Sequence, residues 1–180
     1  MIRMMVLFIL FGVYASLYTQ ENLQKPANAI EISPLSPLMN IYAVHLSHMT
    51  DSKNEFITGP VYMKIKYDCG HTDAGGIILG YRRYFSENIH AEYQIWPIYD
   101  NFYESNEQKR YKSFDVWNEF RVGYLYDFQL LNQNAYVNIQ WPFGFALYAG
   151  NKPDSFIEMS KKGDNRFFYY PPLIFIGVRY

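Results

Sequence analysis

Residues 114–129, with the sequence FDVWNEFRVGYLYDFQ, alternate between two kinds of side chain for sixteen residues. Every even position is apolar or aromatic except Asn118, whereas most charged and polar residues stand at odd positions. A period of two is the period of a β-strand whose two faces meet different surroundings. Strands of soluble sheets usually have about five or six residues. This segment therefore predicts an unusually long strand with one apolar and one polar face.

Similar segments fill the chain from residue 28 onwards. We expect strands over residues 28–34, 39–49, 55–68, 76–85, 90–103, 114–129, 135–150 and 167–180. Their connections alternate between short (51–54, 86–89, 130–134) and longer (69–75, 104–113, 151–166), with one short helical turn expected near Ser155. This arrangement is typical of outer-membrane barrels. The predicted fold is all-β: an eight-stranded antiparallel up-and-down transmembrane β-barrel with short periplasmic turns and longer external loops. The connection 35–38 is short at the external end, so whether 28–34 is a full barrel strand stays open.

The N-terminus has the composition of a secretory signal peptide. Arg3 is followed by an apolar run from Met4 to Ala15, which is too short to span a bilayer as a helix. We therefore divide the chain into a signal peptide at residues 1–19 and a barrel at residues 20–180. Cleavage fits after Ala15 or just before Gln20, so the site stays open. The single cysteine, Cys69, has no partner for an internal disulfide, and a net charge of -1 gives no reason to expect a nucleic-acid partner.

The direction of the apolar face decides between two classes of protein. A soluble, lipocalin-like ligand-binding barrel would turn that face inward, and a membrane barrel would turn it outward. We favour the membrane barrel because aromatic residues cluster at both ends of the apolar face, as in interfacial girdles. The chain also ends on an aromatic residue after strict alternation. The residues expected in the two girdles are Tyr67, Tyr99, Tyr103, Phe114, Phe168 and Tyr170 at the loop end, and Tyr126, Phe128 and Tyr180 at the turn end.

This interpretation assigns a face to each strand. In residues 135–150 the odd positions face outward, so Trp141 meets lipid, while simple alternation turns Trp96 inward. In residues 55–68 the odd positions, which include Ile57, Val61, Met63, Ile65 and Tyr67, are the outward apolar face. Arg83 also falls on the lipid side, near the turn end, where its side chain can reach the interface.

The signal sequence, the eight strands, the alternating connections and the terminal IFIGVRY together resemble the small outer-membrane barrels of the OmpA transmembrane domain and OmpX type. The resemblance covers about residues 28–180 and rests on architecture rather than on a functional motif. It implies a location in the cell outer membrane after export through the signal peptide. It also implies contact with outer-membrane lipid and lipopolysaccharide, and recognition by the barrel assembly machinery through the C-terminal Tyr180.

Charged residues of both signs stand on the polar faces. Barrels of eight strands are just wide enough to be filled by side chains or to hold one small ligand. We expect an internal network of ion pairs that plugs the lumen, with a narrow gated channel as the alternative use of the same charges. The residues expected in this network are Glu92, Glu119, Arg121, Arg82 and Arg179.

One short motif raises the alternative of catalysis. The sequence HLSHM places His45 and Ser47 on one face of a strand, and His-x-Ser is similar to the core of the lipid A deacylase motif. The residues that follow, His48 and Met49, depart from that family, and the motif lies at the turn end rather than at the outer leaflet. The sequence therefore favours a non-enzymatic protein with a structural or surface-interaction role, without cofactor or metal, over a lipid A-modifying enzyme on the same scaffold.

Overall fold

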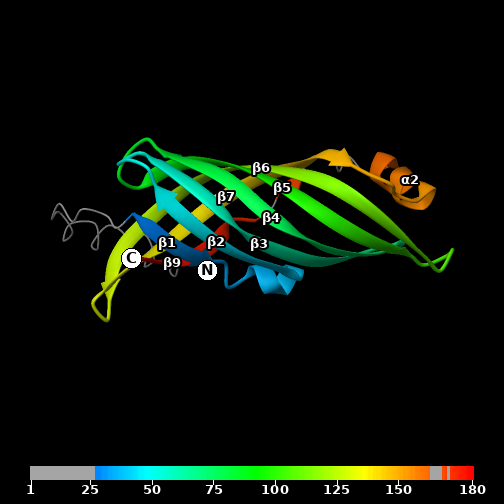
Figure 1. The fold of residues 1–180 in the computed structure, drawn as a ribbon, viewed down its shortest axis with the longest axis horizontal. Coiled ribbons are helices and arrows are strands. Elements are labelled where there is room, and N and C mark those ends of the chain that lie inside the picture. The colour runs from blue at the N-terminus through cyan, green and yellow to red at the C-terminus, as the bar shows by residue number, and fades with distance from the viewer. Residues whose placement is uncertain (1–26, 163–167, 170) are drawn as a thin grey trace, which may run out of the picture.

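A computed structural model describes residues 27–162, 168–169 and 171–180, and these residues form an all-β protein. Eight antiparallel strands follow one another up and down and close into a ring (Figure 1). The predicted signal peptide, residues 1–19, lies outside the described residues. The predicted fold class is thus confirmed as far as a closed, eight-stranded, up-and-down antiparallel sheet.

Hydrogen bonding joins each strand to its neighbours around the whole ring. The ring runs β1, β2, β3, β4, β5, β6, β7 and β9, and β9 pairs with β1 to close it. The short strand β8 pairs with β7 ahead of β9. The bounds are β1 Asn28–Ile32, β2 Ile41–Met49, β3 Asn54–Tyr67, β4 Gly70–Tyr84, β5 Ile89–Glu104, β6 Lys109–Leu130, β7 Gln133–Ala149, β8 Phe168–Tyr169 and β9 Leu173–Arg179, with a 3-10 helix η1 at Ser36–Met39 and a helix α2 at Asp154–Lys162.

Each predicted strand segment has its counterpart in the ring. The segment at 28–34 forms β1, which is short but pairs with both β2 and β9 and is therefore a member of the ring. The helical turn expected near Ser155 is α2. At the last segment, the paired residues divide into β8 and β9.

Two of the predicted long loops are wrong. Residues 70–75 belong to β4, and the connection between β3 and β4 is only 68–69. Residues 109–113 belong to β6, which leaves 105–108 as the turn after β5. The stretch GHTDAGG has little intrinsic β-propensity, but its backbone groups pair with β3. Of the three connections predicted to be longer, only the one that contains α2 is long.

The two ends of the ring differ. The described ends of the chain and the turns 50–53, 85–88 and 131–132 lie at one end of the ring, which we call the turn end (Figure 1). The helix α2 lies towards the other end, which we call the loop end, and η1 lies between the two ends. At the turn end, Asp51 accepts hydrogen bonds from the backbone N–H groups of Lys53 at 2.8 Å and Asn54 at 3.0 Å. These bonds and the Asn54 side-chain amide lower the pKa of Asp51.

The face predicted for residues 55–68 is also wrong. In β3 the odd positions point inward: Ile57 and Val61 are buried, whereas Lys64 and Lys66 on the other face are exposed. The reason is that the ring interior is apolar at this level, so this strand packs its apolar face inside. The cluster that it joins contains Val61, Ala74, Ile78, Trp96 and Ile98.

Tyr67, which was expected in an outer girdle, also points inward. Its ring packs edge-on against Phe156 of α2 and is tilted against Phe102, so these aromatic groups close the loop end of the interior. The side chains of Phe168 and Tyr170, expected in the same girdle, lie outside the described residues.

Candidate functional site

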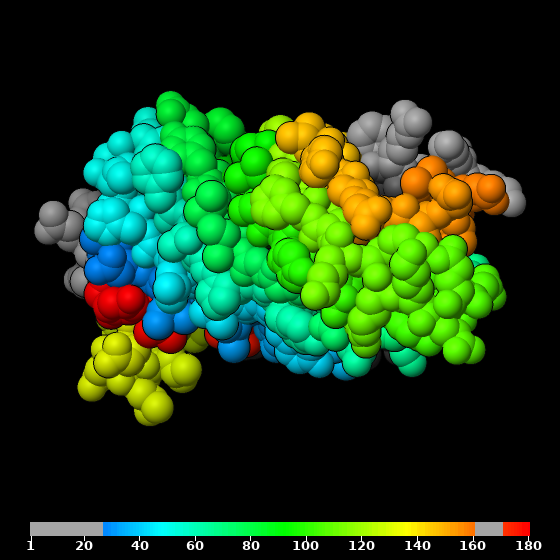
Figure 2. All heavy atoms as spheres, turned by 45° about the vertical axis from the view of Figure 1, so that its right-hand side comes forward, coloured from blue at the N-terminus to red at the C-terminus, as the bar shows by residue number. Residues whose placement is uncertain are grey.

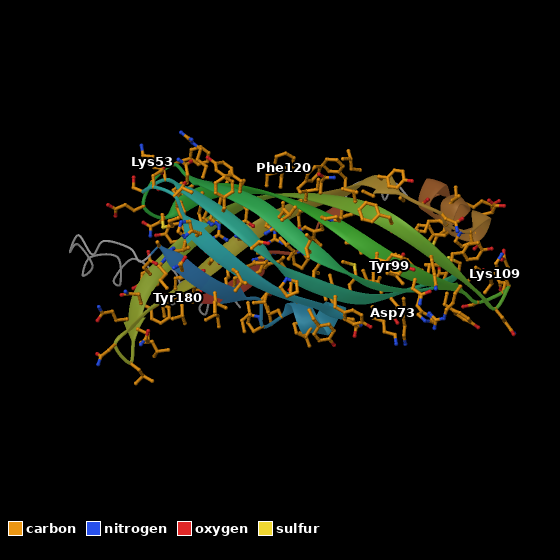
Figure 3. All side chains as sticks on the ribbon, viewed as in Figure 1. Lys53, Asp73, Tyr99, Lys109, Phe120 and Tyr180 are labelled. Carbon is orange, nitrogen blue, oxygen red and sulfur yellow. The ribbon has the colours of Figure 1, made fainter. Side chains whose placement is uncertain are left out.

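The outer face of the ring is apolar, and buried charged and polar side chains occupy the middle of its interior, beside the apolar clusters. Trp141 is 60% exposed, whereas Trp96 is 6% exposed, so the predicted directions of both rings are confirmed. Figure 3 shows Phe120, Tyr99 and Tyr180 on the outside of the ribbon. Other exposed apolar side chains of the ring strands include Ile30, Ile32, Leu46, Phe56, Ile77, Leu79, Val122, Tyr124, Ile139, Ile174, Ile176 and Val178.

The outward apolar runs have similar lengths on neighbouring strands. On β5 the run extends from Ile89 to Tyr99, and on β7 it extends from Val137 to Leu147, eleven residues in each case. A strand of about 9–11 residues, tilted as in a barrel, crosses the hydrocarbon layer of a bilayer. The one polar position in the outward run of β6, Asn118, accepts a hydrogen bond from the hydroxyl of Tyr93.

Arg82 is the centre of the interior. Its guanidinium is 1% exposed and donates to three carboxylates: Glu92 at 2.6 Å, Glu31 at 3.0 Å and Glu55 at 3.1 Å. These acids come from β5, β1 and β3, so one side chain of β4 ties together four strands. A buried charge is tolerated only when it is paired and hydrogen-bonded, and Arg82 meets both conditions.

A second guanidinium extends the network across the ring. Arg121 lies 2.9 Å from Glu119, 3.4 Å from Glu92 and 3.0 Å from Gln140. Its guanidinium also lies 5.2 Å from the ring centroid of Phe175, within the range of a cation–π contact. Arg82 and Arg121 therefore share Glu92, and side chains of β4, β5, β6 and β7 form one continuous polar layer.

Arg179 forms the turn-end part of the interior. It lies 3.3 Å from Asp127 and 4.0 Å from Glu55, and its guanidinium lies over the ring of Tyr136 at 4.7 Å. The five residues predicted to form the internal network are thus all buried, and the structure connects them through Glu55. His45 joins the same network, because its Nδ1 lies 3.0 Å from Glu31.

Sequence reasoning missed two parts of this network. Glu55 was placed on the outward face because the apolar residues of β3 were assigned to lipid. His45 was considered only as a catalytic base. For His45 the available signal was its spacing, two residues before Ser47 on the same face of its strand. For Glu55 there was no such signal, because the alternation of β3 does not say which of its faces points inward.

His45 and Ser47 both point inward, but each is bonded to a different acid. Ser47 donates to Glu55 at 2.5 Å, and the His45 ring contacts Glu31 and stacks on Phe175 with 5.2 Å between ring centroids. Both side chains are buried in the polar layer. The hydroxyl is therefore engaged as a donor to a carboxylate, and its surroundings are those of a structural hydrogen bond.

Beyond the inner apolar cluster, the loop end is closed by side chains of the segment 152–159. The Lys152 ammonium forms ion pairs with Asp100 and, at 2.7 Å, with Asp115. Phe156 packs edge-on against Phe102, and the Cys69 thiol lies 4.0 Å from the sulfur of Met159. Figure 2 shows α2 in orange at this end of the molecule. These contacts occupy the loop end of the interior, and the polar layer occupies its middle.

The described residues contain no group of three or more His, Cys, Asp and Glu side chains that could hold a metal ion. Within the same residues, no helix is long and apolar enough to cross a membrane. The chain matches no protein-family model, no curated protein and no solved structure.

Proposed function

We propose that this protein is an outer-membrane β-barrel with a structural or surface-interaction role, whose lumen is plugged by the internal charge network. The observation that carries the proposal is the reversed distribution of side chains: apolar residues outside, paired charges inside.

The outer surface fits hydrocarbon better than water. Apolar surface left in water costs about 25 cal/mol per Å² relative to burial, and on this protein large apolar side chains lie outside on every strand of the ring. In a bilayer the same side chains are solvated by lipid tails. A closed sheet is also one of the two structures that satisfy all backbone groups in lipid, because it has no free edge.

The edges of the apolar surface fit the two interfaces. Tyr62, Tyr99 and Phe114 lie towards the loop end, and Tyr180 lies at the turn end. Charged residues follow outside these rings: Lys64 and Lys112 at the loop end, for example. Aromatic rings at the headgroup level with charges beyond them are typical of membrane barrels.

The filled interior supports a role without bulk transport. Arg82 and Arg121 with their carboxylates occupy the mid-level, and Lys152 and Phe156 close the loop end. The functional surface is then the outside: the lipid-facing wall and the loop end. Outer-membrane lipid, lipopolysaccharide and the assembly machinery that would read the terminal strand ending in Tyr180 are the partners that this proposal implies.

The test is fractionation of envelopes followed by electrophoresis with and without boiling. A folded barrel resists SDS and changes its migration when heated, so we expect the protein in the outer-membrane fraction with a heat-dependent shift. A protein that is soluble in the periplasmic fraction and does not shift would refute the proposal and favour a soluble barrel.

A further inference from the structure

A stripe of cations crosses the outer face directly beyond the aromatic residues at the loop end. In register, Lys66 of β3 lies opposite His71 of β4, His71 opposite Tyr103 of β5, and Tyr103 opposite Arg110 of β6. Two positions nearer the turn end, Lys64 and Lys112 occupy the same face. Because neighbouring strands lie about 4.8 Å apart, these side chains form one continuous surface.

The four cations of this stripe are Lys64, Lys66, Arg110 and Lys112, and all are exposed. Within the part of the chain that the structure describes, none of them forms an ion pair. The guanidinium of Arg110 lies 5.5 Å from the ring centroid of Tyr103. The one carboxylate at these strand positions, Asp73, accepts a hydrogen bond from the hydroxyl of Tyr62 at 2.7 Å. Asp73 stands opposite Lys64 in the register of β3 and β4, so at these strand positions four cations face one carboxylate.

A gap in the aromatic row lies beside the stripe. Gly75 lies opposite Tyr62 on one side and Tyr99 on the other, so a residue without a side chain separates two exposed rings. A Cβ atom at Gly75 would meet only the carbonyl oxygen of Val61, at 4.0 Å. Packing therefore does not require glycine here, and the absence of a side chain leaves an open position on the outer face between Tyr62 and Tyr99, which we call the slot at Gly75.

We infer that this face binds an anionic membrane lipid, with its phosphate on the cation stripe and an acyl chain in the slot at Gly75. The inference rests on the proposed function, because it needs the apolar wall to stand in a bilayer. Lysine and arginine side chains are the usual protein partners of phosphate oxygens, and four unpaired cations next to an apolar slot match a lipid with a charged head and an apolar tail.

The experiment reconstitutes the full chain in phosphatidylcholine vesicles that contain a small fraction of diphosphoryl lipid A. The lipid retained by the protein after release in mild detergent is identified by native mass spectrometry. Wild type should retain lipid A well above its share of the vesicle. In the K64Q/K66Q variant the enrichment of lipid A should fall by a factor of at least about five, since one cation near an anionic surface strengthens binding roughly fivefold. G75L should also reduce it, while the matched K53Q/R83Q variant at the turn end should not.

Several outcomes would overturn the inference. Retention of lipid A in proportion to its share, or equal losses in K64Q/K66Q and K53Q/R83Q, would mean that the stripe has no lipid preference. All variants change exposed positions, and the heat-dependent gel shift shows whether each has folded. If wild type enters vesicles and shifts on heating without enrichment, the inference alone fails. If wild type does not enter vesicles, the proposed function fails as well.

Discussion

Replacing Arg82 by methionine should be among the most damaging single changes in the chain. The substitution keeps an unbranched side chain of similar length but removes the guanidinium that donates to Glu31, Glu55 and Glu92. These carboxylates are almost fully buried, and each loses its closest guanidinium; Glu92 keeps Arg121 at 3.4 Å and Glu55 keeps Arg179 at 4.0 Å. Removing one partner of a buried ion pair typically costs about 3–5 kcal/mol, and here one cation serves three acids.

The assay is urea unfolding of the folded protein in detergent, read by the heat-dependent gel shift. The matched control is Arg83→Met: Arg83 is the neighbouring residue, faces outward, and donates an exposed hydrogen bond to Asn54 at 3.3 Å. We expect the R82M variant to lose several kcal/mol and the R83M variant less than about 1 kcal/mol, as for exposed polar contacts.

A charge-balanced double variant sharpens this test. Adding Glu92→Gln to the R82M variant removes one of the buried negative charges that lost Arg82, so part of the lost stability should return. The double variant should therefore be more stable than the sum of the two single losses by about 0.5–3 kcal/mol, the usual coupling within one network. Equal effects of R82M and R83M, or additive losses in the double variant, would refute the ionic account of the interior.

Three further outcomes follow from the contacts. Gly177→Ala should destabilise the protein by about 1–3 kcal/mol, because the new Cβ would lie 2.1 Å from the ring of Tyr136. Gly75→Ala should be neutral in the same unfolding assay, because its Cβ has free space. Ser47→Ala should leave the lipid A mass spectrum of the cells unchanged and cost about 1 kcal/mol of stability, since its hydroxyl serves a buried carboxylate; loss of a lipid A modification would instead establish catalysis. Phe156→Ala should speed maleimide labelling of Cys69, the single cysteine, because the loop-end aromatic packing opens, and an unchanged rate would contradict that role for the helix.

Strand positions and most faces could be predicted from the sequence. On β9, and on β6 and β7 away from the register shift at Val116 and Trp117, burial follows the alternation: Phe120 and Trp141 are exposed, and Arg121 and Arg179 are buried. The period of two carries this information because successive side chains point to opposite faces.

The face of β3 could not be predicted in the same way. The interior changes from polar at mid-level to apolar near the loop end, so Val61 belongs inside although it is apolar. Alternation gives two faces but does not say which solvent each one meets, and only the neighbouring strands decide that. Local sequence patterns also could not predict the partners of Arg82, because Glu31 is 51 residues away in the sequence.

The central claim is that the apolar outer wall meets lipid, and quenching of single tryptophans by brominated acyl chains tests it most directly. The chain has three tryptophans. A W96F/W117F variant keeps only Trp141, which is 60% exposed on the outer face, and a W117F/W141F variant keeps only Trp96, which is 6% exposed inside. After reconstitution in vesicles with brominated lipid, we expect strong quenching of Trp141 and little of Trp96. An unquenched Trp141 in folded, vesicle-associated protein would contradict the account.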